Sequence, residues 1–200
     1  MKAKFGILIS HLLDRGPLLE RLEEQLDKQR AGHNCILIIN SDSGKNTTGH
    51  KRNMLLEKAR SEDCSHIAFF DDDDLPGPNY VSLNMEAVKG DYDCASLWGQ
   101  YYENNKKMNP FHHSIKYDHW FQDKHFYYRN PNHLNCIKLS LLNGIQYKDI
   151  TIGEDGNFSQ DLQKAGVLKN EYPINEVIYH YFAGRQEIKN REWEKLMAGI

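Results

Sequence analysis

The chain has 200 residues, enough for one domain with a sizeable core, and its 40% hydrophobic and 26% charged residues are ordinary for a globular protein. A formal net charge of −3 excludes a global field that would attract nucleic acid or a membrane surface. No apolar run reaches the length of a transmembrane helix, and residues 5–9 are too short for a signal peptide's apolar core. The four cysteines form no Cys-x-x-Cys pair. We therefore expect a cytoplasmic protein with buried, reduced thiols and no membrane-spanning segment.

The first third of the chain alternates short apolar runs with helical patterns. Apolar runs at residues 4–10 and 35–40 predict two buried strands. Between them, a Gly-Pro pair opens a helix with a leucine at every fourth position: Leu18, Leu22 and Leu26. A second helix, from about residue 48 to residue 60, leads to a third buried strand. This strand–helix–strand–helix–strand order predicts a parallel sheet.

The third strand, residues 67–70, ends in four consecutive carboxylates, Asp71 to Asp74. The Leu-Pro-Gly-Pro that follows cannot continue a strand, so the acids lie where a buried strand emerges at the edge of the sheet. Open α/β sheets bind their ligands at this edge. Clustered carboxylates repel each other unless a cation is present, and they suit hard ions such as Mg²⁺, Mn²⁺ and Ca²⁺. We interpret the run as a metal site that holds a phosphate; the alternative is a solvated acidic turn.

Basic side chains lie between the two acidic strand ends: Lys45, His50, Lys51 and Arg52. They predict either a cradle for a nucleotide diphosphate or a solvated helix face. The chain has no Gly-x-Gly-x-x-Gly and no complete phosphate loop, which makes dinucleotide cofactors and ordinary kinase chemistry poor candidates.

The second half of the chain begins with a helix at residues 79–89 and a strand at residues 92–98. Residues 101–130 then combine nine aromatic side chains with five Lys or Arg and show no clean period. We expect a largely irregular excursion, which can include a hairpin, of the kind that often sets specificity. Its aromatic and cationic side chains either stack on sugars or bases or close the core over a long loop.

Two further strands are expected at residues 133–139 and 177–182. A helix entered at Gly153 places Glu154 and Asp155 at its start, either as caps that complement the helix dipole or as a catalytic carboxylate that faces the metal site. His180 in the last strand is either an ordinary strand residue or a ligand. The pattern of the tail, residues 184–200, predicts a loop followed by a short helix that Trp193 and Leu196 anchor.

With these motifs in this order, most of the chain resembles GT-A glycosyltransferases, closest to the large inverting family often called family two. Lys51-Arg52-Asn53 falls where that family has an Ala-Arg-Asn helix. The run from Phe69 to Asp74 looks like its strand-ending Asp-x-Asp motif. Residues 135–138 and then Gly153-Glu154-Asp155 resemble its acceptor-side strand and its Glu-Asp motif. His180 matches a third metal ligand of many such enzymes.

The resemblance implies an α/β fold: a single GT-A (Rossmann-like) domain with a mostly parallel central sheet flanked by helices. Residues 1–100 would form the nucleotide-sugar-binding half, and residues 101–200 the acceptor-binding and catalytic half. The implied reaction is a metal-dependent, inverting transfer of a hexose from a nucleotide sugar, with UDP as the commonest carrier. The acceptor would be a hydroxyl of a glycan, a protein or a hydroxymethylated DNA base.

The resemblance also implies roles for single residues. Four would bind the donor: Asp42, Arg52, Asp71 and Asp72. Asp73 and His180 would hold Mn²⁺ or Mg²⁺, which neutralises charge on the departing diphosphate. Asp155, next to Glu154, would be the general base that deprotonates the acceptor hydroxyl. The family's Asp-Asp-Gly-Ser is Ser41-Asp42-Ser43-Gly44 here, so the base-contacting residue stays open, as does the metal-binding member of the acidic run.

Two other functions compete with this interpretation. A sugar-nucleotidyltransferase would carry a glycine-rich basic loop after the first strand, and residues 10–16 lack that run of glycines. A catalytically inactive nucleotide-binding module would have kept the fold without the chemistry. The retained acids, Asp155 and His180 argue against such a module.

Overall fold

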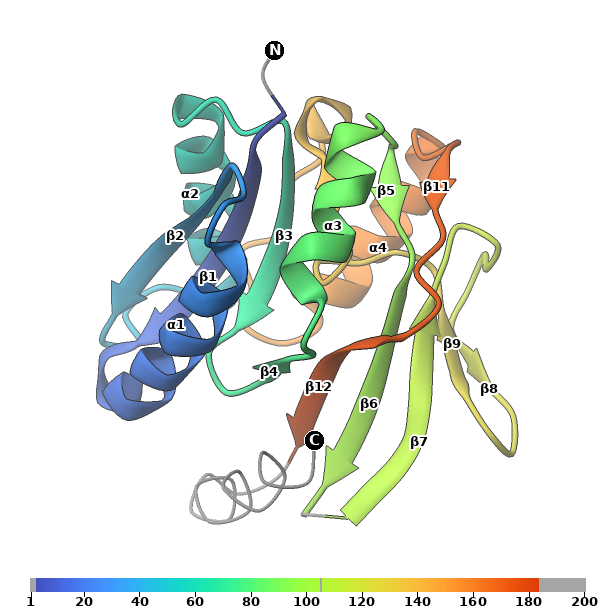
Figure 1. Cartoon of the computed structure of the whole chain (residues 1–200), viewed down its shortest axis with the longest axis horizontal. Helices are drawn as coiled ribbons and strands as arrows, with labels where there is room; N and C mark the ends of the chain where they lie inside the picture. The colour runs from blue at the N-terminus through green and yellow to red at the C-terminus, as the bar shows by residue number, and fades with distance from the viewer. Residues whose placement is uncertain (1–2, 105, 184–200) are drawn as a thin grey trace.

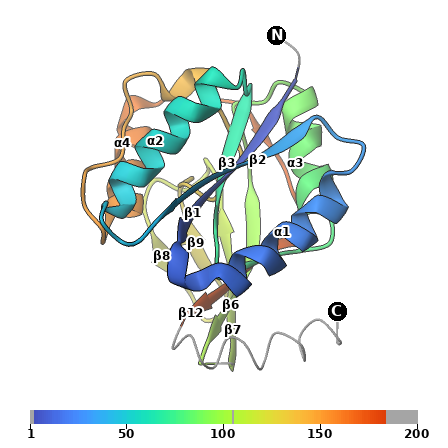
Figure 2. The ribbon, with the colours of Figure 1, turned by 90° about the vertical axis from the view of Figure 1, so that its left-hand side faces the viewer.

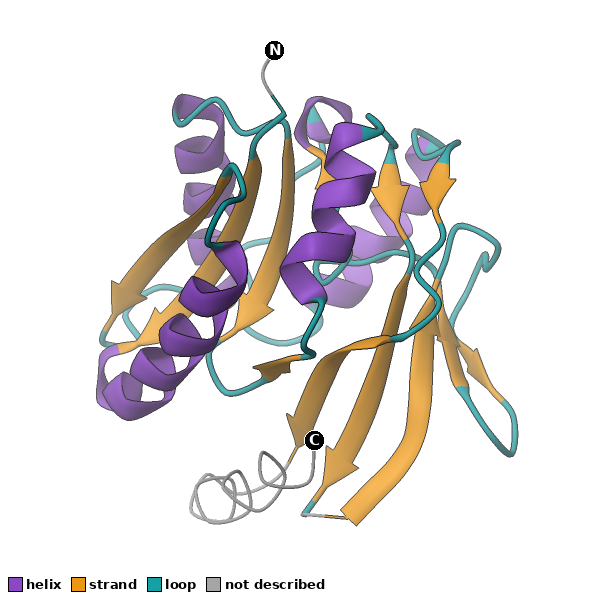
Figure 3. Cartoon of the chain, in the orientation of Figure 1, coloured by secondary structure: helices purple, strands orange, loops and turns teal. Residues whose placement is uncertain are grey.

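The computed structural model describes residues 3–104 and 106–183, which form two six-stranded mixed sheets with helices packed around the first (Figure 1; Figure 3 colours helices, strands and loops separately). The tail helix expected in residues 184–200, with Trp193 and Leu196, lies outside the described residues. Two short 3-10 helices complete the structure, at Leu13–Arg15 and Leu139–Leu142.

The first sheet has the strand order β11, β5, β10, β3, β1, β2. The bounds are Glu171–Tyr172, Cys94–Ala95, Ile137–Lys138, His66–Asp71, Phe5–Leu12 and Cys35–Asp42 respectively. Both β2 and β3 pair with β1 in parallel, which confirms that the strands ending at Asn40 and Phe70 lie in one sheet. Their carboxyl ends therefore lie at the same edge.

The expectation of a mostly parallel central sheet is wrong, because β10 runs antiparallel to both of its neighbours, β3 and β5. Parallel strands need a crossover connection, usually a helix. The chain instead reaches β10 from the second sheet through a loop and enters the first sheet from the opposite end. Only Ile137–Lys138 of the strand expected at residues 133–139 pairs as a strand.

The second sheet has the order β4, β12, β6, β7, β9, β8. The bounds are Leu75–Pro76, Val177–Ala183, Leu97–Glu103, Lys106–His113, Tyr127–Arg129 and Phe121–Gln122 respectively. The expectation of a largely irregular excursion is wrong, since β7, β8, β9 and the last three residues of β6 come from it, but the hairpin that it allowed for is present as β6 and β7, which pair antiparallel. The strand expected at residues 92–98 is split between the sheets, as β5 and the start of β6.

Helices cover both faces of the first sheet (Figure 2). On one face, α1 (Gly16–Arg30) and α3 (Tyr80–Lys89) share a core with Ile7, Ile9 and Phe70. On the other face, α2 (Thr48–Ser61) and α4 (Glu154–Ala165) pack with Leu8 and Phe69. Successive strand residues thus enter opposite cores, which explains why these strands are continuous apolar runs. The first core also contains Leu97, Phe111, Ile178 and Tyr179 of the second sheet, so the two sheets are packed together.

All four cysteines are buried and unbridged, as expected. Within residues 3–104 and 106–183, none of the helices combines the length and the apolar character that crossing a bilayer requires.

Gly49, in the first turn of α2, fixes the loop that precedes α4. Its backbone N donates to the carbonyl oxygen of Ile150 at 3.0 Å, and a Cβ at this position would collide with the carbonyl oxygen of Lys148. Because backbone must move to relieve the clash, we expect Gly49→Ala to lower the free energy of unfolding by about 1–3 kcal/mol, measured by urea denaturation. Gly16→Ala is the control, since its Cβ would meet no described atom within 4 Å. An equal loss in both variants would contradict this packing.

Candidate functional site

A cavity of about 720 Å³ lies between the first sheet and one face of the second sheet. Its polar wall comes from α2, the end of β3, the loop before β10 and the start of α4, and consists of Arg52, Asp71, Asn132, His133, Glu154 and Asp155. Its other wall comes from strands of the second sheet and consists of Tyr101, Glu103, Phe111, Tyr127, Arg129 and Tyr181. Asp71, one of the expected donor-side acids, thus meets the expected catalytic acids Glu154 and Asp155 in one cavity, although residues 71 and 155 are far apart in the chain.

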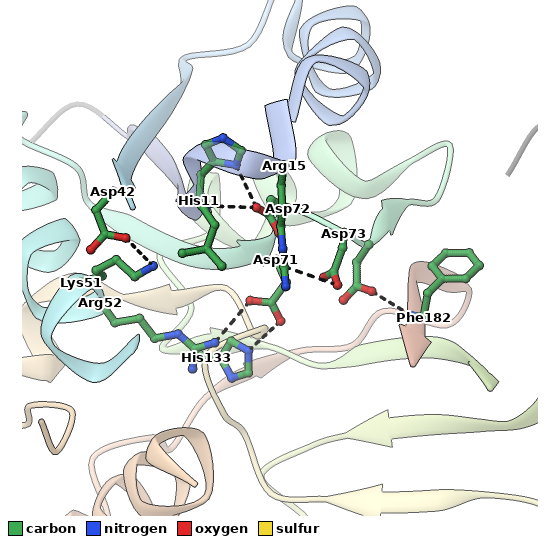
Figure 4. A network of polar contacts seen from close by, with 12 residues as sticks. His11, Arg15, Asp42, Lys51, Arg52, Asp71, Asp72, Asp73, His133 and Phe182 are labelled. Carbon is green, nitrogen blue, oxygen red and sulfur yellow. Dashed lines mark hydrogen bonds and ion pairs between the residues drawn. The ribbon is translucent and has the colours of Figure 1, made fainter. Parts of the chain in front are cut away.

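The carboxylates at the end of β3 and directly after it face different partners rather than one shared centre (Figure 4 shows Asp71, Asp72 and Asp73). Asp72 is 3% exposed; His11 Nδ1 lies 2.8 Å from its Oδ2, and Arg15 Nη1 lies 3.0 Å from its Oδ1. The same guanidinium lies 3.7 Å from Asp73 Oδ2. Asp72 therefore ties the strand end to the turn after β1, and it is not among the residues that line the cavity.

Asp74 is buried and joins the strand end to the second sheet. Its carboxylate accepts hydrogen bonds from the Tyr179 hydroxyl at 2.7 Å and from the Phe182 backbone N at 2.8 Å. Burial, with the charges of Asp73 and Asp71, raises the pKa of Asp74 well above its ordinary value. This carboxyl group therefore anchors β12 and does not face the cavity.

Asp71 is the member of the run that lines the cavity. Arg52 Nη2 lies 3.3 Å from its Oδ1, and His133 Nε2 lies 3.6 Å from its Oδ2 (Figure 4). Burial opposes its ionisation, but the neighbouring His133 and Arg52 outweigh burial and hold the pKa of Asp71 below its ordinary value. Asp71 is therefore a fixed, ionised acceptor at the edge of the sheet.

Arg52 joins the two acidic parts of the site. Its side chain is 5% exposed, and it pairs with Asp71 and, through Nη1 at 3.0 Å, with Glu154 Oε1. The guanidinium carbon also lies 5.6 Å and 5.5 Å from the ring centroids of Phe69 and Tyr147. Burial opposes its charge, but Asp71, Tyr147 and Glu154 raise the pKa of Arg52 above its ordinary value. Arg52 thus holds the end of β3 and the start of α4 at a fixed separation.

Asp42 lies at the end of β2, next to the start of α2. Its carboxylate accepts hydrogen bonds from the backbone N of Gly44 and of Asn46, both at 3.0 Å, and Lys51 Nζ lies 3.3 Å away. Burial raises the pKa of Asp42, but the two backbone donors and Lys51 together outweigh burial and lower the pKa to about 2. Asp42 stands beside the cavity wall and does not line it.

Glu154 and Asp155 begin α4 directly after Gly153, whose φ of +82° suits glycine. Both line the cavity, but their partners differ. Glu154 is 6% exposed and paired with Arg52, whereas Asp155 accepts a bond from its neighbour Gly156 N at 2.8 Å. Within the described residues Asp155 forms no ion pair. It is the acid of this pair that remains available to a ligand.

His180 faces away from this cavity. Tyr181 of β12 pairs with Tyr101 of β6, and both line the cavity; successive strand side chains alternate, so His180 lies on the opposite face. Its Nδ1 lies 3.4 Å from the Tyr102 hydroxyl, and it lines a separate hollow of about 280 Å³ beside α1 and β4. Burial, with the charge of Lys107, lowers the pKa of His180 to about 4.

The described residues contain no group of three His, Cys, Asp or Glu side chains that could hold a metal ion by themselves. Asp72 and Asp74 are turned to protein partners, while the Asp73 side chain is 19% exposed beside Asp71. Hard ions such as Mg²⁺ are often held by one or two carboxylates together with substrate phosphates. Asp73 fits an ion of that kind, completed by a diphosphate, better than an all-protein cage.

Sequence reasoning missed three residues that line the cavity: Asn132, His133 and Tyr181. Tyr101, Tyr127 and Arg129 also line it, and they belong to residues 101–130, whose aromatic and cationic side chains were expected either to stack on a ligand or to close the core. The spacing of Tyr101 and Glu103, two residues apart, is a local signal that both side chains lie on one face of the β6 strand. No local pattern marks Asn132 or His133, which lie in a loop whose position depends on contacts with distant strands.

No family model and no curated protein sequence matches the chain. Among solved structures, it is similar to S. aureus TarS 1-349 in complex with UDP-GlcNAc, with a TM-score of 0.59 and 13% identity over 94% of this chain and 61% of that chain. S. aureus TarS 1-349 in complex with UDP has a TM-score of 0.59 and 14% identity over 90% of this chain and 61% of that chain. S. aureus TarS has a TM-score of 0.58 and 12% identity over 98% of this chain and 39% of that chain. The chain spans less than two thirds of these structures, and the likeness shows that it shares their fold.

Proposed function

We propose that this chain is a glycosyltransferase that moves a sugar from a nucleotide sugar to an acceptor hydroxyl. The observation that carries the proposal is one cavity in which Asp71, ionised by its neighbours at a strand end, and Asp155, without an ion pair in the described part of the chain, lie on the same polar wall. The fold adds support, because TarS, which has a similar fold, is solved with UDP and with UDP-GlcNAc. UDP is therefore the first carrier to test.

On the donor side, Asp42, Arg52 and Asp71 are proposed to bind the nucleotide, with Asp72 fixing the turn that carries Asp71. On the acceptor side, Asp155 takes the proton of the acceptor hydroxyl while the hydroxyl oxygen bonds to the anomeric carbon. The bond from that carbon to the diphosphate breaks, and the electron pair leaves with the nucleotide. A single displacement of this kind inverts the configuration at the anomeric carbon. A divalent ion on Asp73 would supply positive charge for the leaving diphosphate.

A neutral glycan is the acceptor that the second wall favours. Tyr101, Tyr127 and Tyr181 offer aromatic faces to the cavity. Of the described cations in residues 101–130, Arg129 lines the cavity, whereas the four lysines are exposed elsewhere. A polyanion such as DNA would need several cations along its path, and its binding would fall steeply with salt. Acceptor binding that is indifferent to salt is therefore the expected result, and a steep fall would instead favour DNA.

Titration calorimetry with UDP tests the donor site and Asp73. We expect UDP to bind more tightly with Mn²⁺ than without it, and Asp73→Ala to lose at least about tenfold in the affinity measured with Mn²⁺. Asp118→Ala is the control, because that exposed carboxylate lies outside the cavity. A parent protein that binds neither UDP nor any of a panel of nucleotide sugars would overturn the proposed function. An Asp73→Ala variant that binds UDP with Mn²⁺ as tightly as the parent would overturn only the ion assignment.

A further inference from the structure

The loop that joins the second sheet to β10 holds four buried polar side chains: Asn130, Asn132, His133 and Asn135. Two of them are satisfied inside the protein. Asn130 Nδ2 donates to the carbonyl oxygen of Ser159 at 3.1 Å, and Asn135 Nδ2 donates to that of Ala95 at 2.9 Å. These two bonds fix the loop to α4 and to β5 of the first sheet.

The other two, Asn132 and His133, line the cavity. Asn132 is fully buried; its Oδ1 accepts from Leu134 N at 3.0 Å, but its Nδ2 has no hydrogen-bond partner among the described residues. His133 is 5% exposed, and neither of its ring nitrogens has a hydrogen-bond partner in the described chain. The 3.6 Å from its Nε2 to Asp71 Oδ2 is too long for one. An unmet buried polar group destabilises the fold, so two neighbours on a cavity wall indicate a partner from outside the protein.

The loop is held rigidly at this place. The His133 carbonyl oxygen accepts from Phe69 N at 2.9 Å, which ties the loop to β3 two residues before Asp71, and Asn132 N donates to Asn135 Oδ1 at 3.1 Å. In Figure 4, the His133 ring lies with Arg52 against Asp71. The two unmet side chains therefore stand beside the acid that we assign to the donor.

The chemistry of the two side chains selects a neutral ligand with both donors and acceptors. Burial, and then the charge of Arg52, lower the pKa of His133 although Asp71 raises it, and the imidazole offers a ring N–H donor and, in its neutral form, an acceptor as well. Asn132 Nδ2 offers two donors. A phosphate group accepts only and would meet the negative charges of Asp71, Glu154 and Asp155 on the same wall. Sugar hydroxyl groups both donate and accept, and they carry no charge.

We propose that Asn132 and His133 bind hydroxyl groups of the sugar that is transferred, and thereby select the donor sugar. This inference rests on the proposed function and adds to it the residues that recognise the sugar rather than the nucleotide. Both residues are assigned to binding, and neither takes part in breaking or making a bond.

Titration calorimetry with two ligands separates sugar recognition from nucleotide recognition. The ligands are UDP and whichever of UDP-glucose, UDP-galactose and UDP-GlcNAc binds the parent protein most tightly. His133→Phe keeps a ring beside Phe69 and removes both nitrogens; Asn132→Asp keeps the oxygen that accepts from Leu134 and removes the amide donors. We expect each variant to lose about tenfold in affinity for the nucleotide sugar and less than about twofold for UDP.

His112→Phe is the matched control, since that ring lies on the other face of the second sheet, stacked on Trp98 with centroids 4.1 Å apart, and does not line the cavity. It should bind both ligands as the parent does. A parent that binds no nucleotide sugar overturns the proposed function and this inference together. The inference alone is overturned if the parent binds a nucleotide sugar and both variants, His133→Phe and Asn132→Asp, bind the two ligands as tightly as the parent does. It is also overturned if the variants lose the same affinity for UDP as for the nucleotide sugar.

Donor analogues that lack single sugar hydroxyls give a second measurement, which does not depend on how well one variant folds. The parent should bind at least one analogue about tenfold more weakly than the full donor. The Asn132→Asp or His133→Phe variant should bind that analogue no more weakly than it binds the full donor, because removing either partner of one hydrogen bond already removes the bond, so the two losses of affinity do not add. Full additivity with every analogue would overturn the assignment.

Discussion

Asp155→Asn is expected to slow sugar transfer by about 10²-fold or more while the affinity for the nucleotide stays nearly unchanged. The substitution is almost isosteric, and the asparagine oxygen can still accept from Gly156 N, which the carboxylate binds at 2.8 Å. The start of α4 is therefore preserved. What the side chain loses is the ability to take a proton from the acceptor hydroxyl, which is a poor nucleophile without a base.

The neighbouring acid supplies the comparison for this measurement. Glu154 forms an ion pair with Arg52 at 3.0 Å and is 6% exposed, so the protein already holds its carboxylate. Steady-state kinetics should show a larger fall in kcat for Asp155→Asn than for Glu154→Gln, with calorimetry confirming that Asp155→Asn still binds UDP. A fall in UDP affinity as large as the fall in rate would show that Asp155 caps the helix rather than serving as the base.

Local pattern was sufficient to place the strand ends and the start of α4. The apolar runs before Asp42 and Asp71, and the glycine before Glu154, are each a few residues long and depend on no distant contact. The parallel triplet of β1, β2 and β3 follows from the helices between them, because a crossover helix is the usual way to join parallel strands. These features of the sequence are enough to predict that the donor-side acids lie at one edge of one sheet.

The other features of the fold and the site depend on strand register and on contacts between distant segments of the chain. Whether His180 faces the cavity is decided by one residue of register, since Tyr181 beside it lines the cavity and His180 does not. The acidic run looks like one cluster in the sequence, yet its members bind different elements: Asp72 contacts His11 of β1, and Asp74 contacts Tyr179 of β12. The second sheet was hidden because both of its faces carry aromatic side chains, which removes the alternation that marks a strand.

Arg52→Met is expected to lower the free energy of unfolding by about 3–5 kcal/mol at pH 7, since it leaves Asp71 and Glu154 without their shared counterion in a largely buried site. We expect the variant also to lose UDP affinity, because Asp71 and the start of α4 are no longer held at a fixed separation. Urea denaturation gives the first quantity and calorimetry the second. Arg52→Lys keeps the charge but lacks the fork that reaches both acids, so its losses should be intermediate.

The pH dependence separates a lost charge pair from a lost packing contact. The folded-state pKa of Asp71 lies below the unfolded value of about 3.9, so its contribution to stability is present above that pH and disappears as the pH falls through the folded value. The gap in stability between parent and Arg52→Met should thus be widest near neutral pH and shrink below about pH 4. A gap that stays constant with pH would mean that Arg52 stabilises the fold through its contacts with the rings of Phe69 and Tyr147. The double variant Arg52→Met with Glu154→Gln should recover part of the loss, because removing the second partner also removes one uncompensated buried charge.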